Sequence, residues 1–89
     1  MAQLKVELVN RLGLHARAAA KFVHTASRFG AQILVRHDDQ EVNGKSILGL
    51  LLLAAPYGSS LTITATGEDE ALALESLDVL IRERFGEAE

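Results

Sequence analysis

The sequence predicts an α+β fold in which one mostly antiparallel sheet lies beneath a single layer of helices. Some stretches alternate apolar and polar residues with the period of a half-buried strand, and others have the longer period and the capping residues of helices. Along the chain they give the order β-α-β-β-α-β-α. Three helices are enough to cover only one face of a four-stranded sheet.

The first third of the chain predicts a strand followed by a helix. Leu4, Val6 and Leu8 alternate with polar neighbours, and a turn follows at residues 10–13. Residues 16–28 then have a helical apolar period, which Gly30 ends. The helix face expected to be buried carries Ala19, Phe22, Val23 and Ala26.

The middle of the chain predicts two extended segments joined by an acidic turn. Ile33 and Val35 alternate with their neighbours in "AQILVRH". The turn at residues 38–40 leads into a short extended piece through Val42, and Asn-Gly at residues 43–44 predicts a further turn.

The last third predicts a strand and a long helix. "SLTITATG" alternates through Leu61, Ile63 and Ala65. A helix from Asp69 to Phe85 follows, acidic at its start, basic near its end and stopped by Gly86. Its expected buried stripe is Ala71, Leu74, Leu77, Leu80, Ile81 and Phe85.

Length and composition fit one small globular domain over residues 1–89. The 48% hydrophobic content argues against disorder. The absence of cysteine excludes disulfides, thiolate catalysis and cysteine-ligated metals. The N-terminus does not resemble a secretory signal, and the longest apolar run, residues 47–55, is too short to cross a bilayer. We therefore expect a cytoplasmic protein with no membrane insertion.

The net charge is −3, and the charged residues are distributed unevenly along the chain. Residues 8–37 contain five Lys or Arg and no acidic residue, whereas residues 38–89 contain eleven acids and three bases. The basic half favours an anionic substrate or an acidic partner surface, although two ordinary solvated surfaces explain the charges equally well. Nucleic acid is a poor candidate partner because aromatic residues are scarce and the overall charge is negative.

A histidine stands where the first helix is expected to begin, in "GLHARAAA". A helix start presents unpaired N–H groups and positive potential, which together suit a phosphoryl group. His15 would place a nucleophilic nitrogen there, Arg17 would add a guanidinium for the phosphoryl oxygens, and Gly13 would let the backbone come close. The alternative is that His15 only caps the helix and that Arg17 is solvated.

Ser46 ends the letters "NGKS", which are also the last letters of a P-loop. A P-loop requires a glycine where this chain has Asp39, so that interpretation is rejected. Ser46 is better interpreted as the N-cap of a short helix that runs through Leu53, before a loop at residues 56–58.

This short helix carries two apolar arcs. Leu50 and Leu53 share one side and are expected to pack on the sheet. The other arc would then be exposed and would mark an interaction site, unless the helix is buried all round. It consists of Ile47, Leu48 and Leu51.

"GLHARAA" after "NRL", "NGKSILGL" about thirty residues later and "TGEDEALALESL" in the last helix resemble the HPr family of the bacterial phosphotransferase system. The resemblance covers essentially the whole chain. It implies an open-faced β-sandwich of four strands and three helices. It also implies that His15 accepts a phosphoryl group on Nδ1 from enzyme I, which phosphoenolpyruvate charges, and donates it to the A domain of a sugar-specific enzyme II.

The resemblance further implies a phosphate site made by His15, Arg17 and the backbone N–H groups of Ala16 and Arg17. Such a protein is a carrier rather than an enzyme that turns over, it needs no cofactor, and we expect a monomer. In some members a kinase phosphorylates the serine that matches Ser46, which blocks docking to enzyme I and creates a corepressor for a transcription regulator. The residues matching Ile47, Leu48 and Leu51 form the docking surface.

One residue departs from the family pattern, which usually reads His-Ala-Arg-Pro. Ala18 stands in place of the proline. Alanine restores an N–H in the first helical turn at little energetic cost, so we expect a functional site, and the substitution leaves partner specificity and subfamily open.

Two other classes of function remain open. A small phosphohydrolase or transferase would need a second acid or base, and the sequence offers no carboxylate near the His15 motif. A regulatory relative, either of a nitrogen-type phosphotransferase system or a corepressor in catabolite repression, would act by binding partner proteins without transferring phosphoryl groups. No metal site is expected, because His24 and His37 have no ligand spacing with His15.

Overall fold

Four strands form one antiparallel sheet in the order β1-β4-β2-β3. The computed structural model describes residues 1–88. The long strand β4 lies between β1 and β2, and the short β3 forms one edge. The strands are β1 (Ala2–Glu7), β2 (Gln32–His37), β3 (Gln40–Asn43) and β4 (Ser60–Thr66). The predicted antiparallel sheet is therefore confirmed.

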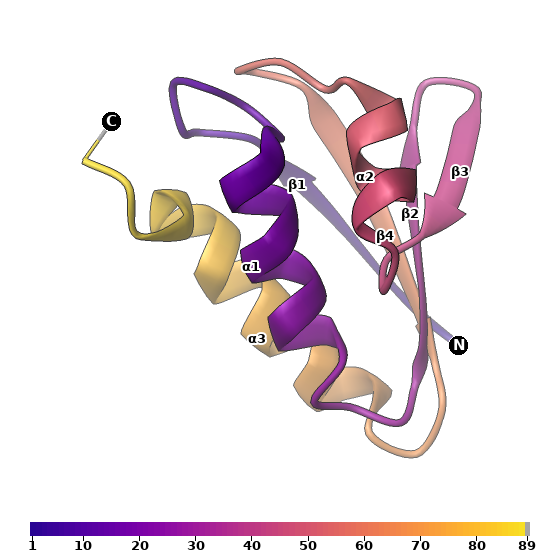
Figure 1. The fold of residues 1–89 in the computed structure, drawn as a ribbon. Coiled ribbons are helices and arrows are strands. Elements are labelled where there is room, and N and C mark those ends of the chain that lie inside the picture. Colours follow the sequence, from indigo (N-terminus) through magenta and orange to yellow (C-terminus); the bar gives the residue numbers. More distant parts are fainter. Residues whose placement is uncertain (89) are drawn as a thin grey trace.

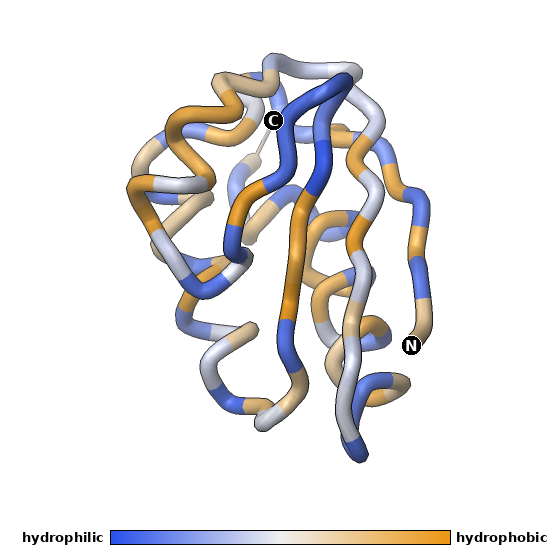
Figure 2. The backbone as a smooth tube through the Cα atoms, turned by 90° about the vertical axis from the view of Figure 1, so that its right-hand side faces the viewer, coloured by the Kyte–Doolittle hydropathy of each residue, from blue (hydrophilic) through white to orange (hydrophobic). Residues whose placement is uncertain are grey.

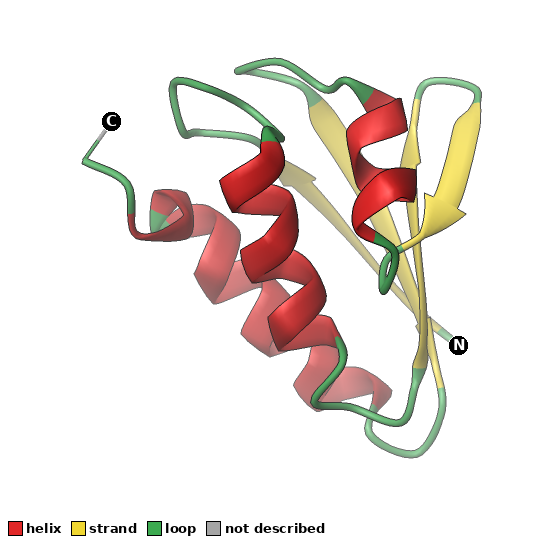
Figure 3. Cartoon of the chain, viewed as in Figure 1, coloured by secondary structure: helices red, strands yellow, loops and turns green. Residues whose placement is uncertain are grey.

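All helices lie on one side of this sheet, as Figures 1 and 3 show. They are α1 (Ala16–Ala26), α2 (Ile47–Leu53) and α3 (Glu70–Arg82), followed by the 3₁₀ turn η1 (Arg84–Gly86). α1 and α3 run side by side, and α2 packs between α1 and β3. The arrangement is the open-faced sandwich that the resemblance to the family implied. No helix within residues 1–88 is long and apolar enough to span a bilayer.

The core lies between the sheet and the helices. Ile63 at the centre of β4 pairs with Leu4 of β1 and Val35 of β2, so these three side chains share the face that the helices cover. Thr62 and Thr64 point to the open face and are only half-buried. In Figure 2, α2 is largely hydrophobic and the tip of the β2–β3 hairpin is hydrophilic.

The first helix was predicted nearly as observed. Ala19, Phe22 and Ala26 are fully buried, and Val23 is half-buried against the core. α1 ends at Ala26 rather than at Arg28, because the N–H groups of Arg28 and Phe29 donate to carbonyls three residues back, those of Thr25 and Ala26, instead of four.

The last helix differs from the prediction in two respects. Ala71 is exposed and Ala73 is buried instead, because the buried stripe follows the four-residue spacing of Ala73, Leu77 and Ile81. The helix also ends at Arg82. Phe85 is buried as expected, but it reaches the core from the separate turn η1.

Candidate functional site

His15 is the N-cap of α1, as the sequence led us to expect. Its backbone is extended, with φ −89° and ψ −179°, and its carbonyl accepts the first helical hydrogen bond, from the N–H of Ala19 at 2.8 Å. Its Nδ1 accepts a hydrogen bond from the N–H of Arg17 at 3.3 Å. The ring therefore stands over the N-terminus of the helix, where the helix dipole favours negative charge.

A tight turn before the helix sets the position of His15. Gly13 has φ +68°, its N–H donates to the carbonyl of Asn10, and its own carbonyl accepts from the N–H of His15. A side chain at Gly13 would not fit, because its Cβ would lie 2.6 Å from the carbonyl oxygen of Ala55. The loop is thus held against the segment that follows α2.

A second chain reversal brings the C-terminal segment to the same place. Arg84, Phe85 and Gly86 all have left-handed backbone conformations, with φ of 58°, 55° and 78°. Such conformations are costly for residues with a side chain and need support from the surrounding structure. Burial of Phe85 supplies it, together with the hydrogen bond that Nζ of Lys21 donates to the carbonyl of Phe85 at 2.6 Å.

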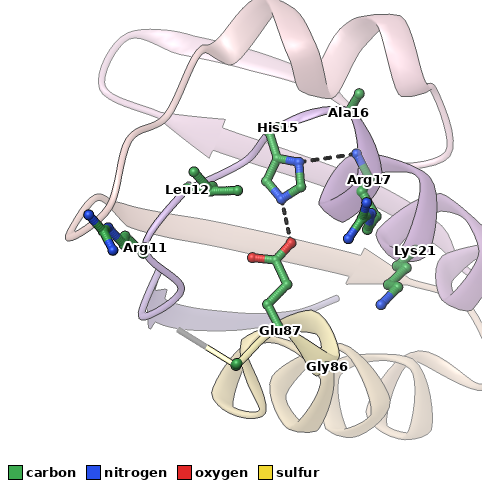
Figure 4. A pocket seen from close by; sticks show the side chains of 9 residues that line it. Arg11, Leu12, His15, Ala16, Arg17, Lys21, Gly86 and Glu87 are labelled. Carbon is green, nitrogen blue, oxygen red and sulfur yellow. Dashed lines mark hydrogen bonds and ion pairs between the residues drawn. The ribbon is translucent and has the colours of Figure 1, made fainter.

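The reversal places Glu87 against His15, as Figure 4 shows. Oε2 of Glu87 is hydrogen-bonded to Nε2 of His15, and Oε1 accepts from Nδ2 of Asn10 at 3.1 Å. Burial of the Glu87 carboxyl raises its pKa. The hydrogen bonds from Asn10 and His15 and the positive charges of His15 and Arg17 lower it by more, so the pKa lies below the usual value for a glutamate. An ionised carboxylate only accepts hydrogen bonds, so Nε2 carries the proton.

The expectation that no carboxylate lies near the His15 motif is therefore wrong. Glu87 is 72 residues away along the chain, and its approach depends on a turn of non-helical residues that no periodicity indicates. Gly86 ends the turn η1 rather than α3, and it carries no information on the direction that the chain takes afterwards.

An open cavity of about 840 Å³ surrounds the ring of His15. Arg11, Arg17 and Lys21 line it, and Glu87 is the one acidic residue among its described lining residues. Within residues 1–88 the guanidinium of Arg17 makes no ion pair and remains available to an incoming anion. The cavity can thus receive a phosphoryl group beside the imidazole.

Ser46 is the N-cap of α2, as predicted, and its Oγ accepts from the N–H of Gly49 at 3.1 Å. Leu50 and Leu53 are buried, so this arc of the helix packs as expected. The opposite arc is exposed, and Leu52, which was not part of the predicted arc, extends it. We call these exposed residues the α2 patch: Ile47, Leu48, Leu51 and Leu52.

The other two histidines do not join this site. His24 is exposed on α1, and Nε2 of His37 lies 3.7 Å from the carboxylate of Asp38. Neither lines the cavity at His15.

Comparison with known proteins assigns the chain to a family. Residues 2–83 match the family described as "PTS HPr component phosphorylation site". A phosphocarrier protein HPr from Neisseria meningitidis serogroup A is 47% identical over 89 residues, which cover all of both chains. A crystal structure of HPr from Thermoanaerobacter tengcongensis has a TM-score of 0.96 and 44% identity and covers 100% of each chain.

A further similar structure is that of Crh, the catabolite repression protein of Bacillus subtilis, which is described as a swapped dimer. It has a TM-score of 0.75 and 45% identity and covers 94% of this chain and 97% of its own. Together with the fold and the histidine at the start of α1, these similarities show that the chain belongs to the HPr family of phosphocarrier proteins of the phosphotransferase system.

Proposed function

We propose that this protein accepts a phosphoryl group from phospho-enzyme I on Nδ1 of His15 and passes it to the A domain of a sugar-specific enzyme II. The observation that carries the proposal is the position of His15 as N-cap of α1, with Nδ1 directed at the N–H of Arg17. A phosphoryl group on Nδ1 would lie where the helix start offers hydrogen-bond donors and positive potential.

The chemistry uses groups that the site already holds. The lone pair of Nδ1 forms the bond to phosphorus while the bond between phosphorus and the donor breaks, and the donor keeps that electron pair. The backbone N–H groups of Ala16 and Arg17 and the guanidinium of Arg17 then stabilise the phosphoryl oxygens. The 3.3 Å bond from the Arg17 N–H to Nδ1 is long and is easily exchanged for one to a phosphoryl oxygen.

In this proposal the protein is a stoichiometric carrier rather than an enzyme, and it needs neither a metal nor a cofactor. Docking to enzyme I and enzyme II would use the α2 patch, since α2 packs beside α1. The proposal keeps the expectation that the protein is cytoplasmic and acts as a monomer.

The test is the intact mass of the protein after incubation with phosphoenolpyruvate and enzyme I. We expect one phosphoryl adduct that is labile in acid and stable in alkali. It should be absent from His15→Ala and also from His15→Asn, which keeps a good capping side chain and so controls for the loss of the N-cap. Failure of the wild-type protein to form an adduct would refute the proposal.

The α2 patch and the similarity to Crh favour a second candidate, a regulatory role through protein binding. In this role a serine kinase would phosphorylate Ser46, and the product would bind a transcription regulator. Phosphate at the start of a helix is electrostatically tolerated, so its effect would fall on partner surfaces. The role predicts a kinase-dependent adduct that persists in His15→Ala and disappears in Ser46→Ala.

A further inference from the structure

We propose that Glu87 is a positioning residue that holds His15 in the one tautomer able to accept a phosphoryl group. The proposal deepens the function proposed above and rests on it. The two ring nitrogens of His15 are engaged from opposite sides: Nε2 by the carboxylate of Glu87 and Nδ1 by the N–H of Arg17. A carboxylate requires a proton on Nε2, and a backbone N–H requires a lone pair on Nδ1, so both contacts select the same tautomer.

Glu87 is itself held in place. Asn10, which is fully buried, donates through Nδ2 both to Oε1 of Glu87 at 3.1 Å and to the carbonyl of Gly13 at 2.7 Å. Both acceptors are oxygens, which fixes the orientation of the Asn10 amide. The bond from Lys21 to the carbonyl of Phe85 anchors the turn just before Glu87. The side chain of Glu87 is 11% exposed, so water competes only weakly for its oxygens.

The contact leaves the reacting nitrogen open. Glu87 approaches Nε2, on the far side of the ring from Nδ1, and so does not occupy the place of the phosphoryl group. When Nδ1 bonds to phosphorus, the ring keeps its Nε2 proton and gains positive charge. When the phosphoryl group leaves, the electron pair of the N–P bond returns to Nδ1, and the ring is again neutral with the proton still on Nε2.

The carboxylate also balances charge during this cycle. Arg11, Arg17 and Lys21 line the same cavity and disfavour positive charge on the ring, whereas Glu87 is the one acid among the described lining residues. A hydrogen bond to a charged group in a partly buried site is among the stronger ones. Glu87 therefore stabilises the phosphorylated ring as well as orienting the free one.

The test compares Glu87→Ala, Glu87→Gln and Glu83→Gln with the wild type. Glu83 is an exposed residue near the same end of the chain, outside the cavity, and serves as the matched control. The first measurement is the ¹⁵N NMR spectrum of labelled His15 at alkaline pH, where the ring is neutral. The second is the rate of phosphoryl transfer from phospho-enzyme I under saturating and subsaturating conditions.

We expect wild type and Glu83→Gln to show the Nε2–H tautomer alone. Glu87→Ala should populate the Nδ1–H tautomer and lower the saturated transfer rate about tenfold, with little change in apparent affinity. Glu87→Gln retains an acceptor oxygen without the charge, so it should keep the tautomer and have an intermediate rate.

A wild-type tautomer spectrum or a wild-type rate in Glu87→Ala would overturn the inference while leaving the carrier function intact. Absence of transfer to the wild type would instead refute the carrier function. The tautomer measurement on the unphosphorylated protein would still report on the role of Glu87 in positioning the ring.

Discussion

The side-chain amide of Asn10 donates a hydrogen bond to Oε1 of Glu87 across 77 residues of sequence. The same amide holds the carbonyl of Gly13, so one buried side chain joins the loop before α1 to the segment after η1. His15 lies between these two segments. Its position depends on long-range contacts as well as on the helix that it caps.

Substitution of Gly13 should destabilise the protein far more than substitution of Gly58, a glycine that also has a positive φ. Gly13→Ala combines a φ of +68° with a Cβ placed 2.6 Å from the Ala55 carbonyl oxygen. We expect a loss of about 3 kcal/mol in the free energy of unfolding, from left-handed strain plus steric overlap. Urea denaturation measures it.

Gly58→Ala is the matched control for this prediction. Gly58 has φ +86°, and nothing lies within 4 Å of a Cβ built there. Its cost should be backbone strain alone, about 1 kcal/mol. Equal losses in the two variants would show that the contact of the Gly13 turn with Ala55 is not rigid.

Local sequence signals predicted the parts of this site that depend on local structure. The strands follow from alternation, and His15 as N-cap follows from the place where the helical period begins. The α2 patch follows from the 100° spacing around a short helix, although the predicted arc did not include Leu52, which lies next to Leu48 and extends it.

Two features could not be predicted from local signals. "ALALESL" has apolar residues at four consecutive positions, so its period did not decide between Ala71 and Ala73 as the buried residue. The approach of Glu87 to His15 depends on left-handed conformations at Arg84 and Phe85, which are residue types that do not favour them. The tertiary packing of Phe85 determines the backbone conformation of that turn, and a single sequence contains no signal for this packing.

Ser46 should stabilise the fold as a helix cap whatever its regulatory role. Ser46→Ala removes the bond from the Gly49 N–H to Oγ and should lower the free energy of unfolding by about 1 kcal/mol. Ser46→Asp retains a good capping oxygen and should stay within about 0.5 kcal/mol of wild type. Thermal and urea denaturation of the three proteins test this. A loss of the same size in both variants would contradict the capping role.

Asp69 should make the stability of the protein depend on pH in the acid range. Its carboxylate accepts the N–H groups of Gly30 at 2.8 Å and Ala31 at 2.9 Å. The bond from Gly30, followed by that from Ala31 and the charge of Lys45, outweighs burial and holds the pKa of Asp69 below its ordinary 3.8. The stabilisation is then fully present above about pH 4 and is lost as pH falls through the lowered pKa.

Asp69→Asn should therefore be less stable than wild type at pH 7 and should lose less stability on acidification. Asp39→Asn, at the exposed tip of the β2–β3 hairpin, provides the control. Urea denaturation between pH 2 and pH 7 measures the three curves. An Asp69→Asn curve parallel to the wild-type curve would show that this carboxylate does not contribute to acid unfolding.

The α2 patch should matter for partner binding and not for folding. Leu48 is 75% exposed on α2, and Leu72 is 61% exposed on α3, so a charge at either position should change the free energy of unfolding by less than about 0.5 kcal/mol. If partners dock on the α2 patch, Leu48→Asp buries an unpaired charge in the interface. We expect the apparent affinity for phospho-enzyme I to fall tenfold or more, with the saturated transfer rate little changed.

Leu72→Asp is the control and should accept phosphoryl groups with the wild-type apparent affinity and rate. Equal effects of the two substitutions, or a loss in the saturated rate alone, would place the docking surface elsewhere on the molecule.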